Sequence, residues 1–183
     1  MNKTNIIVGV CGGISSYKTC YLIRLLKKEK FSVKVVMTPN ATHFITPLVF
    51  ETLSENPVYV DMFKERKKEL EHISLAEWCH LCIVAPLTCN TLSKIAHGIC
   101  DNLLTTLILA LPPRIKIILA PAMDENMWKN PITQENLKKL EKIKRYIILK
   151  PQKGELASGK YGEGRMVEPS LILETVKKLT KRK

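Results

Sequence analysis

The sequence predicts an α/β fold in which a doubly wound, mostly parallel sheet carries helices on both faces. Three observations lead to this expectation. Short apolar runs rich in Val and Ile alternate along the chain with segments whose apolar residues recur at helical spacing. A Gly- and Ser-rich loop directly follows the first apolar run. The length of 183 residues suits a single domain spanning residues 1–183, with room for a substantial core.

The start of the chain predicts a βαβ unit. A β-branched apolar run bounded by glycine indicates a buried strand, and Leu22, Leu25 and Leu26 have the spacing of one helix face. The expected order is a strand, a loop, a helix and a strand, at residues 5–10, 11–16, 17–30 and 32–37. A unit of this kind joins parallel strands through a right-handed crossover.

The same alternation continues to the end of the chain. Further strands are expected at residues 81–86, 116–121 and 146–149, and further helices at residues 90–97, 103–111, 131–142 and 169–179. The arrangement is therefore flavodoxin-like or Rossmann-like. Residues 64–71 and 152–166 are polar or Gly-rich, which predicts flexible loops.

The chain is strongly basic, with 29 Lys and Arg against 17 Asp and Glu and a net charge of +12. Such a balance can indicate a nucleic-acid partner. Here the positive residues are mixed with acids and lack interleaved aromatic residues, so we expect solvated helix faces and no nucleic acid. A positive field also suits a phosphorylated small-molecule substrate.

The six cysteines are expected to be free thiols in a reducing cytoplasm, because the chain begins without a signal peptide. Cys79 and Cys82 have the spacing of a metal-binding pair but lack a second pair, so no metal site is predicted. No apolar run reaches the ~18–20 residues of a membrane-spanning helix, so we expect no membrane role.

Candidate ligand-binding residues follow the predicted strands, and ligands of such sheets lie at the carboxyl ends of the strands. Gly12 and Gly13 permit a close backbone approach to a phosphate or ring, although a tight turn with a Ser N-cap explains them equally well. Thr88 and Asn90 suit a polar ligand or a helix cap. The two Met and the Trp of residues 121–128 suit a flat ring or core packing.

Two further features point to chemistry. His72 is expected to precede an amphipathic helix that contains Leu75, Ala76 and Trp78, and imidazole is the side chain that exchanges protons most readily near neutral pH. A lone histidine is nevertheless more often structural or simply exposed. Residues 154–166 contain four glycines and are expected to form either a lid or a plain surface connection.

Together these segments resemble the homo-oligomeric flavin-containing cysteine decarboxylase family over nearly the whole chain, and most closely its coenzyme A branch. Seven segments in the right order make the resemblance specific. They are Gly12-Gly13-Ile14, Phe44-Ile45-Thr46-Pro47-Leu48, His72-Ile73-Ser74-Leu75, Ala85-Pro86-Leu87-Thr88-Cys89-Asn90-Thr91-Leu92, Gly98-Ile99-Cys100-Asp101-Asn102-Leu103-Leu104-Thr105, and residues 121–128 and 156–166.

The resemblance implies FMN as the cofactor. In this family FMN oxidises the thiol of a cysteine substrate, here 4′-phosphopantothenoylcysteine, to a thioaldehyde. Loss of carbon dioxide then becomes easy, and reduction of the ene-thiol gives 4′-phosphopantetheine. His72 matches the catalytic base, Ser158 the position of the final proton donor, and Asp124, Met127 and Ala157 the substrate-binding positions. The implied flavin contacts are Gly12, Gly13, Ile14, Thr38, Phe44, Thr88, Cys89, Asn90, Thr91, Asp101, Asn102 and Ala122.

Two positions depart from the family pattern. Asp124 stands where the family has an Asn that holds the substrate carboxylate, and an ionised Asp repels a carboxylate unless it is protonated or paired with a cation. Ser158 stands where the coenzyme A enzymes commonly have a Cys, and a hydroxyl is a far weaker acid than a thiol. Oxidative decarboxylation is therefore better indicated than the reduction that follows it.

Three alternatives remain open at this stage. A peptidyl-cysteine oxidative decarboxylase that releases an ene-thiol suits Ser158, whereas a flavin prenyltransferase suits the fold but not the motifs at His72 and residues 121–128. The third is a non-catalytic flavin-binding regulatory subunit. The resemblance also implies a homotrimer, or a dodecamer of four trimers, with flavin at a subunit boundary. A phosphopantothenate–cysteine ligase, fused or separate, is the expected partner.

Overall fold

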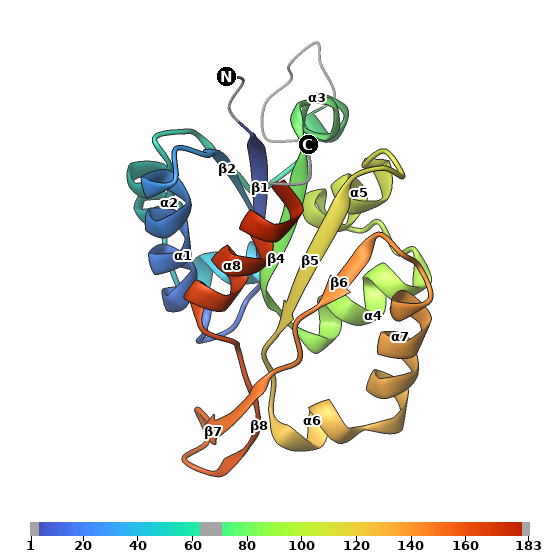
Figure 1. Cartoon of the computed structure of the whole chain (residues 1–183). Helices are drawn as coiled ribbons and strands as arrows, with labels where there is room; N and C mark the ends of the chain where they lie inside the picture. Colours follow the sequence, from blue (N-terminus) through green and yellow to red (C-terminus); the bar gives the residue numbers. More distant parts are fainter. Residues whose placement is uncertain (1–3, 63–70, 181–183) are drawn as a thin grey trace.

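The computed structural model describes residues 4–62 and 71–180 and is built around a six-stranded, entirely parallel sheet. The strand order is β3-β2-β1-β4-β5-β6 (Figure 1). The strands are β1 (Asn5–Val10), β2 (Ser32–Met37), β3 (Val58–Tyr59), β4 (Leu81–Leu87), β5 (Lys116–Pro121) and β6 (Tyr146–Ile148). This is the Rossmann-like order of the two arrangements expected, and the strand order reverses between β1 and β4.

Helices cover both faces of the sheet, as predicted (Figure 1). One face carries α1 (Ser16–Lys28), α2 (Pro47–Ser54) and α8 (Pro169–Thr180). The other face carries α3 (Glu71–Trp78), α4 (Cys89–His97), α5 (Leu103–Ala110) and α7 (Pro131–Glu141). Within the described residues, no helix is long and apolar enough to cross a bilayer.

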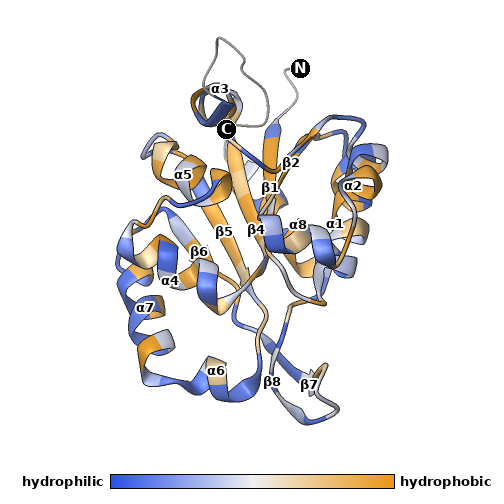
Figure 2. Cartoon of the chain, turned by 180° about the vertical axis from the view of Figure 1, so that it is seen from behind, coloured by the Kyte–Doolittle hydropathy of each residue, from blue (hydrophilic) through white to orange (hydrophobic). Residues whose placement is uncertain are grey.

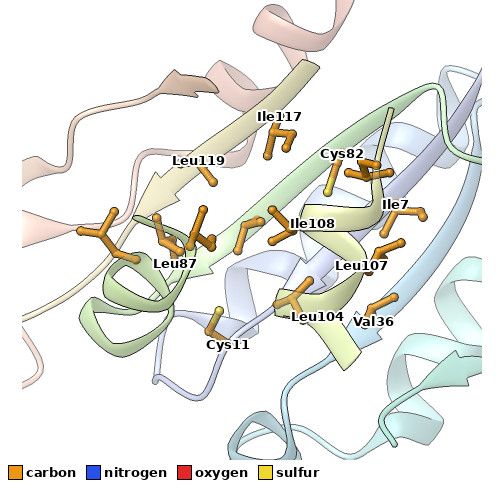
Figure 3. Close-up of a cluster of buried hydrophobic side chains, with 14 of the residues drawn as sticks. Ile7, Cys11, Val36, Cys82, Leu87, Leu104, Leu107, Ile108, Ile117 and Leu119 are labelled. Atoms are coloured by element: carbon orange, nitrogen blue, oxygen red, sulfur yellow. The ribbon is translucent and has the colours of Figure 1, made fainter. Parts of the chain in front are cut away.

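The core lies in two layers, one on each side of the sheet. All seven residues of β4 are buried, as expected for a central parallel strand whose two faces are both covered by helices. Figure 3 shows Ile7, Cys82 and Ile117 of three adjacent strands beneath Leu104 and Leu107 of α5. In Figure 2 the central strands β1, β4 and β5 are coloured mostly as apolar, whereas helices such as α7 carry many polar residues.

Several short elements were not predicted from the sequence. β3 has two residues, and α6 (Glu125–Lys129) and the 3₁₀ helix η1 (Pro39–His43) have five each, too few for a periodic signal. The helix α2 was not predicted either, because Leu48 and Val49 on it are exposed. His72 lies in the first turn of α3 and does not precede that helix.

The prediction that residues 152–166 form a loop was wrong. β7 (Gln152–Glu155) and β8 (Tyr161–Arg165) pair as an antiparallel hairpin. The two strands pair through backbone hydrogen bonds, which do not require particular side chains. Their sequence is polar and Gly-rich and lacks the β-branched residues by which strands are usually predicted. Of the other predicted loop, residues 64–70 lie outside the described residues, and Glu71 begins α3.

Candidate active site

A cavity of about 1150 Å³ opens at the carboxyl ends of the parallel strands, at the point where the strand order reverses. Ligands of doubly wound sheets bind at this position. The walls come from the loop after β1, the start of α4, the loop before α6 and the tip of the β7–β8 hairpin. The volume exceeds the ~300–1,000 Å³ of common ligand pockets, so there is room for a cofactor and a substrate together.

The loop after β1 offers an open backbone surface. A Cβ atom at Gly12 would lie 2.8 Å from the backbone carbonyl of Asn40, so only glycine permits this close approach. At Gly13 the nearest atom to an added Cβ is the Thr88 methyl group at 3.7 Å, which leaves the backbone open toward the cavity. The Ser16 hydroxyl donates to the Gly13 carbonyl at 2.6 Å and fixes the turn. A phosphate or flat ring can therefore approach this backbone at the start of α1.

The start of α4 forms the facing wall. Thr88 is the N-cap of this helix, and its hydroxyl accepts a hydrogen bond from the Thr91 amide at 3.4 Å. Cys89 lies beside the Thr133 hydroxyl at 3.5 Å, while Asn90 is exposed on the cavity side. Capping and ligand binding are therefore compatible here, since the helix N-terminus still favours an anion.

Asp101 and Asn102 border the cavity and are held by structural contacts. The Lys94 ammonium donates to Asp101 at 2.6 Å, and this hydrogen bond lowers the pKa of the Asp101 carboxyl. Asn102 caps α5 by accepting from the Thr105 amide at 3.1 Å, and its amide nitrogen donates to Asp101 at 2.9 Å. The three cavity residues therefore form one linked polar group.

Asp124 is the N-cap of α6. Its carboxylate accepts a hydrogen bond from the Asn126 amide at 2.8 Å. An Asn side chain can make the same bond, so the change from the family's Asn preserves the cap and alters the charge. Ala122 and Met127 lie beside Asp124 on the cavity wall.

The tip of the β7–β8 hairpin closes the cavity, with Leu156, Ala157 and Ser158 on the lining. At the base of the hairpin, the Met123 amide donates to the Gly164 carbonyl at 3.0 Å. The Glu125 carboxylate accepts from the Glu163 amide at 3.4 Å. The hairpin is thus attached to the loop that carries Asp124.

A buried lysine strengthens the base of the hairpin. Lys18 lies in α1 with only 6% of its surface exposed, and its ammonium donates to the Met166 carbonyl at 3.2 Å and to Glu168 at 2.8 Å. The Lys18 hydrogen bond is the main cause of the lowered pKa of Glu168, which Arg165 also contacts at 2.9 Å. Lys18 was not among the predicted site residues, although its i, i+4 spacing to the buried Leu22 places it on the apolar face of α1.

Most predicted site residues meet at this cavity, and two do not. The cavity gathers Gly12, Gly13, Ile14, Thr38, Thr88, Cys89, Asn90, Thr91, Asp101, Asn102, Ala122, Asp124, Met127, Ala157 and Ser158. Phe44 is the C-cap residue of η1, is about half exposed and does not line the cavity. His72 lies in α3 at the other end of the sheet, where Asn5 at the start of β1 donates to the Trp78 carbonyl at 3.0 Å (Figure 1).

Comparison with known proteins identifies the family. The family described as Flavoprotein matches residues 1–181. The chain belongs to this flavoprotein family. The predicted family and the predicted flavin are thereby confirmed.

Two curated relatives and one solved structure are notably similar. The coenzyme A biosynthesis bifunctional protein CoaBC of Borreliella burgdorferi is 44% identical over 172 residues, which cover 94% of this chain and 43% of that protein. The probable phosphopantothenoylcysteine decarboxylase of Streptococcus mutans is 39% identical, with 93% of this chain and 96% of that protein covered. The chain thus spans under half the length of the bifunctional relative.

The solved structure is a cysteine-to-serine mutant of PPC decarboxylase in complex with pantothenoylaminoethenethiol. It superposes with a TM-score of 0.86 at 33% identity and covers 98% of this chain and 100% of that chain. The predicted fold class is confirmed by this similarity and by the strand order.

Proposed function

We propose that this flavoprotein domain, residues 1–183, binds FMN and decarboxylates 4′-phosphopantothenoylcysteine to 4′-phosphopantetheine. The observation that carries the proposal is the cavity, which brings the open Gly13 backbone, the N-terminus of α4 and the hairpin tip at Ser158 around one space. When bound, FMN supplies the two-electron oxidation of the substrate thiol and the later return of electrons.

The residues present fit a flavin nucleotide. The Gly13 backbone is open on the cavity side, so a flat ring or a phosphate can lie against it. The N-termini of α1 and α4 favour the phosphate charge. Gly12–Ile14 and Thr88–Thr91 would hold the cofactor, and the loop from Ala122 to Met127 and the hairpin tip would enclose the substrate.

Asp124 would lie beside the substrate carboxylate. Because an ionised Asp124 repels that group, Asp124→Asn should keep the α6 cap and lower KM for the substrate. Steady-state kinetics of the two proteins test this role. An unchanged KM would show that Asp124 does not face the carboxylate.

His72 would reach the cavity from a second copy of the chain. Exposed apolar side chains occur on two separate parts of the chain. One set is Ile14, Tyr17, Tyr21 and Leu48, of the loop before α1 and of α1 and α2, and Ile14 and Tyr17 of this set line the cavity. The other set is Ile73 and Leu109, on the two helices α3 and α5 that pack together. Two different surfaces suit a heterologous contact, which closes into a ring such as the expected trimer. Phe44 would then lie at the same subunit boundary.

Mixing two inactive variants tests this shared site. His72→Asn lacks the base, and Gly13→Trp fills the cofactor surface. Random co-assembly in a trimer leaves roughly a quarter of the sites with both native halves, so activity should return to about that level. If mixed assemblies regain no activity, His72 either acts in the site of its own chain or has no part in catalysis.

A second outcome is supported by Ser158. The hairpin tip presents a hydroxyl to the cavity where the coenzyme A enzymes commonly have a thiol. Arrest at the ene-thiol is therefore the alternative product, on the same substrate or on a peptide that ends in cysteine. Mass analysis of the product distinguishes the two outcomes. The reduced thiol has lost carbon dioxide alone, whereas the ene-thiol has lost carbon dioxide and two hydrogens.

Exchange of the hairpin-tip residue tests which outcome applies. Ser158→Cys should raise the reduced fraction of the product, whereas Ser158→Ala should not. If the reduced fraction of the product is unchanged in both variants, another group protonates the product. If 4′-phosphopantothenoylcysteine is not altered at all, the protein acts on a peptide substrate or is a regulatory subunit.

The substrate also identifies the expected partner reaction. A ligase that joins cysteine to phosphopantothenate must supply it, either on the same polypeptide or as a separate protein. The six cysteines are unpaired in the structure, which suits the reducing cytoplasm in which we expect this reaction.

A further inference from the structure

A lysine occupies a position of β2 that faces the helix layer of α3 and α5. Lys34 is paired in register with the core residue Ile7 of β1, and neighbouring residues of adjacent parallel strands point to the same face of a sheet. Val36, two residues further on, belongs to the same buried cluster as Leu75 of α3. An apolar residue is the ordinary choice at such a position, so the charge of Lys34 requires a reason.

Two aromatic rings surround the ammonium group. The Nζ atom of Lys34 lies 4.5 Å from the ring centroid of Trp78 in α3 and 5.9 Å from that of Tyr59 in β3. Both distances are within the ~6 Å of a cation–π interaction. Within the described part of the chain, no carboxylate forms an ion pair with Lys34. Burial lowers the pKa of Lys34, as expected for an ammonium group that has lost part of its water.

The helix that Lys34 contacts is short and, within the described residues, packs mainly on α5. Of the eight residues of α3, only Leu75 and Ala76 are buried. Its carboxyl end is attached to the start of β1, where Asn5 donates to the Trp78 carbonyl at 3.0 Å. Apolar contact is not directional, so the contact between the Lys34 ammonium and the Trp78 ring adds a directional constraint on the orientation of this short helix.

We propose that Lys34 is a positioning residue that sets the orientation of α3 through Trp78, and thereby places His72. This inference rests on the catalytic role proposed above for His72. His72 and Trp78 are six residues apart on one helix, so about 9 Å of rigid backbone joins them. A small rotation at Trp78 therefore displaces the imidazole. Displacements near 1 Å can lower a rate by about a hundredfold.

A positioning role differs from a purely structural one in its consequences. Lys34→Met retains most of the side-chain length and places an apolar group on an apolar face, so the fold should tolerate it. Lys34→Arg keeps a cation that can stack on Trp78. Lys28→Met removes a charge from an exposed position at the end of α1 and serves as the matched control.

The test measures α3 directly as well as turnover. Amide hydrogen exchange across residues 71–78 reports the opening of α3 without any reaction. In Lys34→Met we expect faster exchange in α3 and a kcat that is roughly three- to thirtyfold lower, with FMN content and KM unchanged. Lys34→Arg and Lys28→Met should resemble the wild-type protein in all four measurements.

The result that overturns the proposal is native exchange in α3 with native kcat in Lys34→Met. A lower thermal midpoint with unchanged kcat in the folded protein would also overturn it, because Lys34 would then be structural only. The His72→Asn protein separates this failure from that of the proposed function. If His72→Asn turns over normally, the role of His72 is lost, whereas the exchange measurement still decides whether Lys34 holds α3.

Discussion

Replacement of Gly164 by alanine tests whether the docked β7–β8 hairpin belongs to the site. Gly164 has a φ of +154°, and an added Cβ would lie 2.0 Å from the backbone carbonyl oxygen of Met123. Real Cβ atoms do not approach an oxygen this closely, so the two backbones must separate. Separation also breaks the 3.0 Å hydrogen bond from the Met123 amide to the Gly164 carbonyl.

The free energy by which Gly164→Ala destabilises the docked hairpin follows from these two contacts. An unfavourable backbone conformation costs ~1–3 kcal/mol, and a lost hydrogen bond costs about 1 kcal/mol. The docked state of the hairpin should therefore lose roughly 2–4 kcal/mol, or about 30- to 700-fold in its equilibrium with an undocked state. The core of the sheet does not involve this contact, so global unfolding should change much less.

KM for 4′-phosphopantothenoylcysteine and hydrogen exchange of residues 152–165 measure the effect. We expect KM to rise at least about tenfold and exchange in the hairpin to accelerate. Gly159→Ala is the matched control, since Gly159 has a φ of +77° but no atom within 4 Å of an added Cβ. If Gly164→Ala matches Gly159→Ala in both measurements, the docked hairpin is not part of the site.

Three further predictions concern the cavity walls. Lys18→Met leaves the Met166 carbonyl and Glu168 without their buried donor, so urea denaturation should show a loss of roughly 2–3 kcal/mol; a loss below about 0.5 kcal/mol would contradict the role of Lys18. The pKa of Glu168 is held below its ordinary value of 4.5, so its contribution to stability is complete above pH 4.5 and is lost as pH falls through the lower, folded-state pKa. Glu168→Gln should therefore differ in stability from the wild-type protein at pH 7 and converge with it in strong acid, and a pH-independent difference would refute this. Gly12→Ala forces the loop away from Asn40, so flavin absorbance per chain should fall severalfold, and full flavin content would show that the loop adapts.

The central sheet could be predicted because its signals are local. The buried run of β4 and the strand–loop–helix–strand pattern at residues 5–37 reflect burial on both faces, which leaves continuous apolar segments. The β7–β8 hairpin could not be predicted in this way. Its docking depends on Gly164 fitting against Met123, a contact between residues far apart in the chain.

In the site, too, the features set by local sequence could be predicted and those set by contacts distant in the chain could not. Gly13 and Thr88 follow strands directly, so the strand pattern alone places them at one edge of the sheet. Lys18 was missed because a lysine in a helix ordinarily indicates a solvated face, and its partner Glu168 lies 150 residues away. The position of His72 outside the cavity could not be anticipated from helix spacing, since the packing of α3 on α5 and its contacts with β1 and β2 decide where that helix lies.

The most direct test of the proposed function is mass analysis of 4′-phosphopantothenoylcysteine after incubation with the purified, flavin-loaded chain. The proposed function predicts a product that has lost carbon dioxide. Two hydrogens are lost as well if the ene-thiol is not reduced, the outcome that a hydroxyl at Ser158 favours. It also predicts that the His72→Asn protein binds flavin but leaves the substrate intact. An unaltered substrate mass with the wild-type, flavin-loaded protein would contradict the proposed function.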